Sequence, residues 1–368
     1  MSWVHTGYAQ RIVFGDDAAA QVADVVKDVG GRRVLLITTA GRLASEAGED
    51  LVRRLGRSLS TTFDGVRSHV PTDTVQAALG MARDRDVDCI VSFGGGSCAD
   101  LGKAVSFFVE QEAGTPGASY IDRPVLPHVS IPTTYSGAEL TPFFGMTDEA
   151  TRRKSGGGGP TTAPLAAIYD PVLTLDTPPR VSAETGMNCL AHGIEAAYSP
   201  ARTPEAEALA LACIERVAAA LPLVVEEPDG LGARRIMLEG AVLGGRCLQN
   251  ASMGVHHGLA QLLGGRTGLP HGLANAMLLA PCVRFNATTV PKVMGRIALA
   301  MGADERDAVL AVETLRERLG LPGRLSEVGV TEDDLDAVAR MAEGNANVRN
   351  NPRPVTEADA RDLLESCF

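Results

Sequence analysis

The chain has 368 residues, of which 45% are hydrophobic and 21% charged, and its formal net charge is −11. This length and apolar content suit about two domains with a large core, and they exclude a disordered or fibrous chain. The acidic balance argues against a nucleic-acid surface or a polybasic membrane patch. We expect a cytoplasmic protein, because the sequence shows no leader pattern, no run of about 18 uncharged apolar residues and no CxxC pair among its seven cysteines.

The first half of the chain predicts alternating strands and helices. Short apolar runs predict strands at residues 33–38, 88–93, 129–132 and 166–169, and helical periodicity predicts helices at 43–59, 74–85 and 99–109. Strands that alternate with helices of this length are typical of βαβ units in a parallel sheet. The glycine run at 156–159, followed by Pro160, predicts an exposed turn.

After about residue 180 the pattern becomes helical throughout. Ala-, Leu- and Glu-rich segments with a 3.6-residue period cover residues 182–198, 204–225, 232–248, 291–301, 304–319, 332–343 and 356–367. Ser182, Thr203 and Thr356 lie where helix N-caps are expected, and Asp359 completes an acidic capping box with Thr356. We therefore predict an α/β domain over residues 1–178 and an all-helical domain over residues 179–368.

A glycine-rich turn follows the predicted strand at 88–93. Gly94, Gly95, Gly96 and Ser97 open the next helix, where bare backbone and free amide groups attract a phosphate. The alternative is a plain tight turn in which Ser97 only caps the helix. Asp100 and Lys103, three residues apart, fit either the same site or a surface ion pair.

A hydroxyl-rich segment, PTTYSGAELT at residues 132–141, follows the next predicted strand. Open α/β sheets bind ligands at the carboxyl ends of their strands, so this segment is a second candidate cofactor contact. The alternative is a loop whose hydroxyl groups satisfy its own backbone.

Three of the seven histidines have suggestive spacings. Asn188 and His192 are four residues apart and share one helix face, while His257 and His271 are separated by fourteen residues with a glycine-rich loop between them. Three imidazoles and one oxygen donor would suit Fe(II) or Zn(II). For each histidine alone, a hydrogen-bonded core position is the alternative. Asn188 weakens the metal interpretation, because an amide binds a cation less well than a carboxylate.

Five segments, taken in order, resemble the iron-containing alcohol dehydrogenase family. They are GGGSCADLGKA (94–104), PTTYSGAELTPFFGMTD (132–148), TGMNCLAHGIEAAY (185–198), HHGLAQLLGG with LPHG (256–272) and NPRPVTEADARDLL (351–364). Asn188, where the metal enzymes carry aspartate, together with the PTTYSGAELTP and NPRP segments, most resembles the branch that reduces maleylacetate. The resemblance implies a dinucleotide-binding α/β domain, a helical domain and an active site in the cleft between them.

The implied reaction is reduction of maleylacetate to 3-oxoadipate, or of a related enone acid, by NADH or NADPH without an obligatory metal. The same resemblance implies a homodimer that serves the catabolism of aromatic compounds. Because Thr38 and Thr39 end the first strand with Arg42 close behind and no carboxylate, we expect both cofactors to work. Two alternatives stay open: a metal-dependent alcohol or polyol dehydrogenase, which Asn188 argues against, and a non-redox cyclase similar to dehydroquinate synthase.

The resemblance also implies roles for individual residues. Those expected to bind the cofactor are Gly94, Gly95, Gly96, Ser97, Asp100, Thr133, Thr134, Ser136, Thr141, Lys154 and Thr38. Those at the family's metal-ligand positions, which we expect to be catalytic, are Asn188, His192, His257 and His271. Candidates for holding the substrate carboxylates are His256, Arg266, Arg349 and Arg353. Gln261 stands where the family has a further histidine, which leaves the proton donor open and leaves room for a repurposed, non-redox site.

Overall fold

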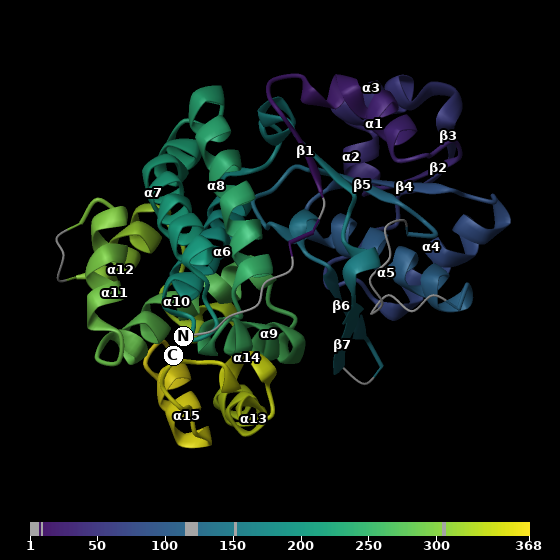
Figure 1. Ribbon diagram of the computed structural model, residues 1–368. Helices are drawn as coiled ribbons and strands as arrows, with labels where there is room; N and C mark the ends of the chain where they lie inside the picture. The colour runs from purple at the N-terminus through teal and green to yellow at the C-terminus, as the bar shows by residue number, and fades with distance from the viewer. Residues whose placement is uncertain (1–6, 9, 115–123, 151–152, 304–306) are drawn as a thin grey trace. The chain divides into compact units, whose positions relative to one another are not determined.

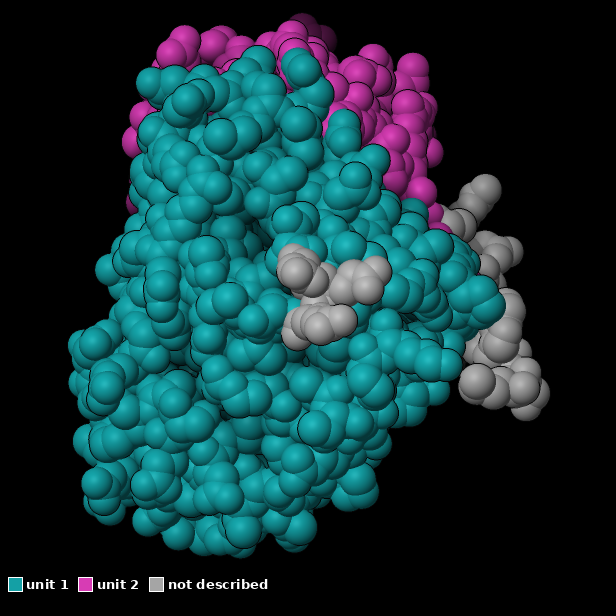
Figure 2. Space-filling model, turned by 90° about the vertical axis from the view of Figure 1, so that its left-hand side faces the viewer, with its two compact units in different colours: residues 1–6, 178–368 teal, residues 7–177 magenta. Residues whose placement is uncertain are grey.

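The computed structural model describes residues 7–8, 10–114, 124–150, 153–303 and 307–368. Two compact units make up this part of the chain, Gly7–Thr177 and Pro178–Phe368 (Figure 2). The first unit contains strands and helices, and the second contains helices alone (Figure 1). This confirms the predicted fold class, an α/β domain followed by an all-α domain.

A six-stranded sheet forms the centre of the first unit. Its strands run in the order β1-β8-β5-β4-β2-β3, and every neighbouring pair is parallel. In chain order they are β1 (Arg11–Phe14), β2 (Val34–Ile37), β3 (Leu59–Phe63), β4 (Cys89–Gly94), β5 (His128–Pro132) and β8 (Ala166–Tyr169). The four central strands β2, β4, β5 and β8 are buried on both faces, which explains why their sequences read as continuous apolar runs.

Helices cover both faces of this sheet (Figure 1). They are α1 (Val22–Asp28), α2 (Ala40–Leu43), α3 (Glu46–Leu55), α4 (Thr72–Asp84) and α5 (Gly96–Glu112). Apolar side chains of α1 and α3 form one core with Leu36 and Val91, whereas those of α4 and α5 form another with Leu35 and Ile90. Successive strand residues thus feed opposite cores, as the period of two requires.

A hairpin of β6 (Phe143–Asp148) and β7 (Arg153–Gly158) lies beside α5. The exposed turn predicted at 156–159 is therefore wrong, since three of its glycines belong to β7. Their missing side chains let β7 approach its neighbours. A Cβ on Gly158 would lie 2.5 Å from the carbonyl oxygen of Pro142, just before β6, and one on Gly157 would lie 3.0 Å from the ring of Phe107 on α5. The glycine run serves close packing here.

The second unit is built from ten helices in the described residues. They are α6 (Pro179–Tyr198), α7 (Pro204–Glu226), α8 (Leu231–Asn250), α9 (Val255–Thr267), α10 (His271–Ala287), α11 (Pro291–Ala300), α12 (Ala308–Arg318), α13 (Glu332–Ala342), α14 (Ala346–Arg349) and α15 (Glu357–Glu365). α6, α7 and α8 pack on one another, and α9, α10, α13 and α15 share a second core. Thr203 and Thr356 cap α7 and α15 as predicted, and Asp359 closes the capping box.

Some predicted boundaries are wrong for identifiable reasons. The helix predicted at 43–59 is divided, because Ser45 caps a new helix by accepting from the Gly48 amide, and residues 59–63 form β3. The prediction of Ser182 as an N-cap is wrong, because α6 begins at Pro179, whose fixed backbone suits a first helical position. Asp304, the predicted start of another helix, lies outside the described residues.

The glycine-rich loop expected between His257 and His271 is also a helix. α9 extends to Thr267, and its turn to α10 is made at Gly268, whose φ of +76° is easy only for glycine. Gly258 lies inside α9, and it is a glycine there because a Cβ would collide with Val348. Glycine content alone predicted a loop, but these glycines are packing positions.

Within the described residues one helix, α7, meets the length and hydropathy of a membrane span, with a mean hydropathy of 2.0 in its best window. Glu215 and Arg216 lie in the middle of this helix, and α6 and α8 pack against it. A core helix of a soluble protein has the same composition. The feature is therefore weak support for a membrane segment.

All seven cysteines are buried and free of disulfides. Burial raises the pKa of Cys89, Cys98 and Cys367 to about 12, and it also raises the pKa of Cys247 and Cys282. The sulfur atoms of two of them, Cys189 and Cys213, lie 3.8 Å apart.

Lys103 of α5 is completely buried and ties the hydroxyl-rich segment to this helix. Its ammonium group donates to the Ala138 carbonyl at 2.8 Å, the Phe143 carbonyl at 2.6 Å and the Thr141 hydroxyl at 2.9 Å. Asp100 supplies the balancing charge at 2.7 Å. The pair is thus not a surface ion pair but a buried support for residues 138–143.

We expect the substitution Lys103→Met to destabilise the first unit by about 3 kcal/mol, because it leaves three oxygen acceptors and the Asp100 carboxylate without their cation. Urea unfolding of the purified variant measures this loss. Lys27→Met, on the exposed side of α1, is the matched control and should change the free energy of unfolding very little. A loss below about 1 kcal/mol for Lys103→Met would contradict the assignment.

Candidate active site

The two candidate cofactor segments meet at the carboxyl edge of the sheet. Gly94, which ends β4, lies opposite Pro132, which ends β5, and the Thr133 amide donates to the Gly94 carbonyl at 2.9 Å. At the end of β2, the buried Thr38 hydroxyl donates to the Phe93 carbonyl at 2.8 Å. Three strands therefore deliver their following residues to one edge, which is where open α/β sheets bind ligands.

The glycine turn forms a cradle that side chains would fill. A Cβ on Gly95 would lie 3.2 Å from Thr134, and one on Gly96 would lie 2.9 Å from the Ser136 hydroxyl. No side chain caps α5 at its N-cap Gly95, and Ser97 lies within the first turn. The first-turn amides of this 17-residue helix are therefore not capped by the N-cap residue. Together with the bare glycine backbone beside them, they could bind a pyrophosphate.

The other predicted cofactor residues have distinct surroundings. Thr141 accepts from Lys103, and Asp100 pairs with the same ammonium group, so both have a structural partner. Thr133 and Thr134 are buried beside the glycine turn. Lys154 lies on β7 opposite Thr147. Their contacts with a cofactor stay predictions.

The structure brings the four family ligand positions together in the helical unit. Asn188 and His192 lie on α6, His257 lies on α9 and His271 is the first residue of α10. The rings of His192 and His257 stack with centroids 4.8 Å apart, and those of His257 and His271 lie 6.4 Å apart. Among these, the Asn188 Oδ1, His192 Nδ1 and His257 Nε2 atoms are buried and have no hydrogen-bond partner. We call these four residues the histidine cluster.

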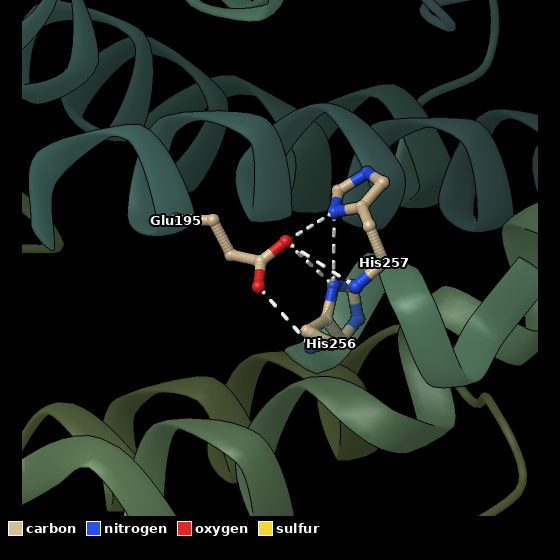
Figure 3. Close-up of side chains that lie close together, drawn as sticks. All are labelled: Glu195, His256 and His257. Carbon is tan, nitrogen blue, oxygen red and sulfur yellow. Dashed lines mark hydrogen bonds and ion pairs between the residues drawn. The ribbon is translucent and has the colours of Figure 1, made fainter. Parts of the chain in front are cut away.

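A buried carboxylate that the sequence analysis missed lies next to this cluster. Glu195, on the same face of α6 as His192, accepts from His257 Nδ1 at 2.5 Å through its Oε2 atom (Figure 3). Its Oε1 atom accepts from the amides of Gly254 at 3.0 Å and His256 at 3.1 Å. The spacing of Asn188, His192 and Glu195 at i, i+4 and i+7 is the signal that could have found it.

The pKa values follow from this burial. Burial, together with the neighbouring His257 and His271, holds the pKa of His192 well below its ordinary value. Burial also lowers the pKa of His257, although the bond to Glu195 opposes the shift. For Glu195 burial acts to raise the pKa, but the bonds to His256 and His257 outweigh it and the pKa lies below its ordinary value. These directions favour neutral imidazoles at His192 and His257 and a carboxylate at Glu195.

The donor set of the histidine cluster fits a transition metal, since three imidazoles and an amide oxygen can supply four ligands. The set offers no anionic ligand. Among the described residues, Glu195, His256 and His257 lie close enough together to hold an ion. Two of these side chains also have other hydrogen bonds: His256 Nε2 donates to the Asn275 carbonyl at 2.8 Å, and Glu195 accepts from the Gly254 amide at 3.0 Å. In the histidine cluster, Asn188 Oδ1, His192 Nδ1 and His257 Nε2 have no hydrogen-bond partner that would compete with a ligand.

The predicted substrate residues have structural partners. Arg266 pairs with Asp334 at 2.8 Å, and Arg353 pairs with Asp359 at 3.1 Å while lying over the Phe285 ring. His256 is completely buried. The fourth candidate, Arg349, donates to the backbone carbonyl of Gly344. Assigning these four side chains to substrate carboxylates stays a prediction.

Gln261, where the family resemblance implies a histidine, lies one turn after His257 on α9. Its Oε1 atom accepts from the side-chain amide of Asn347, Nδ2, at 3.2 Å. The contact holds the Gln261 side chain between α9 and α14.

Family models cover both units of the chain. The model described as iron-containing alcohol dehydrogenase matches residues 9–171, and the C-terminal model of the Fe-containing alcohol dehydrogenase family matches residues 182–368. The chain belongs to the iron-containing alcohol dehydrogenase family. It is thus an oxidoreductase on the fold described above.

Particular relatives narrow the comparison. A maleylacetate reductase of Sphingobium indicum is 33% identical, and the match covers 99% of this chain and 97% of the relative. The crystal structure of maleylacetate reductase from Agrobacterium tumefaciens is 33% identical with a TM-score of 0.87, over 100% of this chain and 98% of that one. A sulfoacetaldehyde reductase from Bifidobacterium kashiwanohense, solved with NAD+, is 25% identical with a TM-score of 0.89, over 100% and 99%.

We expect Gly95→Val to weaken NADH binding more than tenfold, or about 1.4 kcal/mol, because the side chain occupies the cradle beside Thr134. Fluorescence titration of the folded variant with NADH measures the affinity. Gly80→Val on α4 is the control, since a Cβ at Gly80 has nothing within 4 Å. Unchanged affinity in folded Gly95→Val would contradict the pyrophosphate assignment.

Proposed function

We propose that this chain is a maleylacetate reductase that uses NADH or NADPH. The observation that carries the proposal is the histidine cluster, largely buried, in which three imidazoles are completed by an amide and not by a carboxylate. The similarity to maleylacetate reductases over nearly the whole chain supports the choice of substrate. An assay of NADH oxidation with maleylacetate, run with and without chelator, tests it.

The reaction transfers a hydride to a carbon–carbon double bond that is conjugated with a ketone. The hydride of NAD(P)H adds to the alkene carbon remote from the ketone, and the π electrons move onto the ketone oxygen to form an enolate. A proton then adds to the neighbouring carbon, which gives 3-oxoadipate and NAD(P)+. The protein has to bind the cofactor, stabilise the enolate and supply one proton.

Residues of both units would share this work. Gly95, Gly96 and Ser97 would hold the pyrophosphate on the first turn of α5, with Thr134 and Ser136 beside it. His257 and His271 would donate to the enolate oxygen or the substrate carboxylates. Donation from His257 Nε2 requires the imidazolium. The charge of Glu195 opposes the burial that lowers the pKa of His257, and a bound dicarboxylate substrate would oppose it further.

A divalent metal, if bound, would be held by Asn188, His192, His257 and His271, and would polarise the ketone oxygen as a Lewis acid. We propose that turnover does not require it, because Asn188 contributes only a neutral oxygen and the imidazoles can stabilise the enolate themselves. We further propose a cytoplasmic homodimer. The buried cysteines, which form no disulfide, support the reducing compartment, and the homodimer is the family expectation.

Both cofactors should support turnover. No carboxylate occurs among residues 38–44, which follow β2, so a 2′-phosphate meets no unpaired negative charge from this segment. The nearby Asp176 is paired with Arg42 at 3.6 Å. We expect the kcat/KM for NADPH to exceed one hundredth of that for NADH, measured by initial rates with saturating maleylacetate. A lower ratio, a penalty above roughly 2.7 kcal/mol, would contradict the prediction.

Activity should survive removal of metal and be lost with the histidines. We expect enzyme that is metal-free by elemental analysis to keep its kcat, and His257→Ala or His271→Ala to lower kcat by roughly 10²- to 10⁴-fold, the usual effect of a general acid. Steady-state assays of stripped and reloaded protein measure both effects. Activity that disappears on stripping and returns with Fe(II) or Zn(II) would establish the metal-dependent dehydrogenase alternative instead.

A further inference from the structure

The hydrogen bonds around His257 define where its proton lies. Its Nδ1 atom is 2.5 Å from Glu195 Oε2, and a carboxylate only accepts, so Nδ1 carries the hydrogen. His256 Nε2 is bonded to the Asn275 carbonyl, so its own hydrogen is on Nε2 and its Nδ1 is a bare acceptor. That acceptor is 3.3 Å from His257 Nδ1 (Figure 3). Two acceptors therefore face one N–H group.

The Glu195 carboxylate cannot turn away from His257, because the start of α9 holds it. The amides of Gly254, His256 and His257 all donate to it, at 3.0, 3.1 and 3.3 Å. A Cβ on Gly254 would lie 2.8 Å from Glu195 Oε1, so only a glycine at position 254 leaves room for the carboxylate. The positive end of the helix dipole of this 13-residue helix adds to the attraction.

We propose that Glu195 is the positioning residue of the site: it fixes the ring orientation and tautomer of His257, so that Nε2 is presented to the histidine cluster. His257 Nε2 is buried and has no hydrogen-bond partner in the protein. The His257 ring stacks on that of His192, inside the histidine cluster. The Nε2 atom is then available as a lone pair for a metal or, once protonated, as a donor.

The part of this inference that concerns turnover rests on the proposed function, whereas the tautomer and the metal affinity do not. The competing explanation is that Glu195 only caps α9. A cap would be satisfied by any acceptor of the same shape and would leave the His257 proton unaffected. The two explanations therefore differ in a spectroscopic property of His257.

Glu195→Gln separates them, because glutamine keeps an oxygen for the α9 amides but places an N–H group near His257. Glu184→Gln, on the same helix, is the matched control, since that carboxylate pairs with Arg180 at 3.0 Å. We would record long-range ¹H–¹⁵N spectra of metal-free, histidine-labelled protein, assigning His257 from the signals absent in His257→Asn. Titration with Zn(II) alone measures metal affinity, and NADH oxidation with maleylacetate measures kcat and KM.

We expect the proton on Nδ1 in the wild type, and a shift toward Nε2 in Glu195→Gln with Zn(II) affinity and kcat each 10- to 100-fold lower and the KM for NADH unchanged. Glu184→Gln should behave as the wild type. A wild-type His257 protonated on Nε2 would overturn the proposal, and so would a folded Glu195→Gln with wild-type tautomer and Zn(II) affinity.

Should Glu195→Gln fail to fold, the wild-type spectrum still decides the tautomer. Glu195→Asp, which keeps the charge but withdraws it by one methylene, then tests the residue itself. Lower Zn(II) affinity in the aspartate variant would support the proposal, and unchanged affinity would overturn it. If the wild type does not reduce maleylacetate, the spectra and the Zn(II) titration still give their answer, so failure of the proposed function is seen separately.

Discussion

A carboxylate without exposed surface is stable only where donors surround it, and Glu195 meets that condition with three amides and one imidazole. The start of α9, the glycine at 254 and the orientation of His257 all depend on this one charge. Asn351 completes the arrangement by accepting from the Val255 amide at 3.3 Å. In the first unit Lys103 plays the complementary part, as a buried cation that holds a segment through three oxygen acceptors.

The features that could be predicted from the sequence are those encoded by local pattern. The continuous apolar runs of β2, β4, β5 and β8 predicted a parallel sheet, and the parallel topology then placed Gly94 and Thr133 at one edge. Helical periodicity found most of the second unit. The four ligand positions came from a family resemblance, and the structure brings the stacked rings of His192 and His257 together across 65 residues of chain.

The features that could not be predicted depend on tertiary packing. Composition cannot distinguish a glycine that turns the chain from one that admits a neighbour, so β7 and α9 were both expected as irregular segments. Glu195 is an ordinary polar residue on a helix until α9 is packed against it. Similarly, Asp100 and Lys103 at a spacing of three fit a solvated pair as well as a buried one, and only the 1% exposure of the Lys103 side chain decides between them.

The burial of every thiol has a chemical consequence for the lifetime of the protein. Oxidants and electrophiles react with the thiolate, and five of these thiols are held protonated by raised pKa values in addition to being shielded from water. Damage of this kind therefore requires the chain to open first. Resistance to such modification is then a property of the whole packed core, and it is lost when the core unfolds.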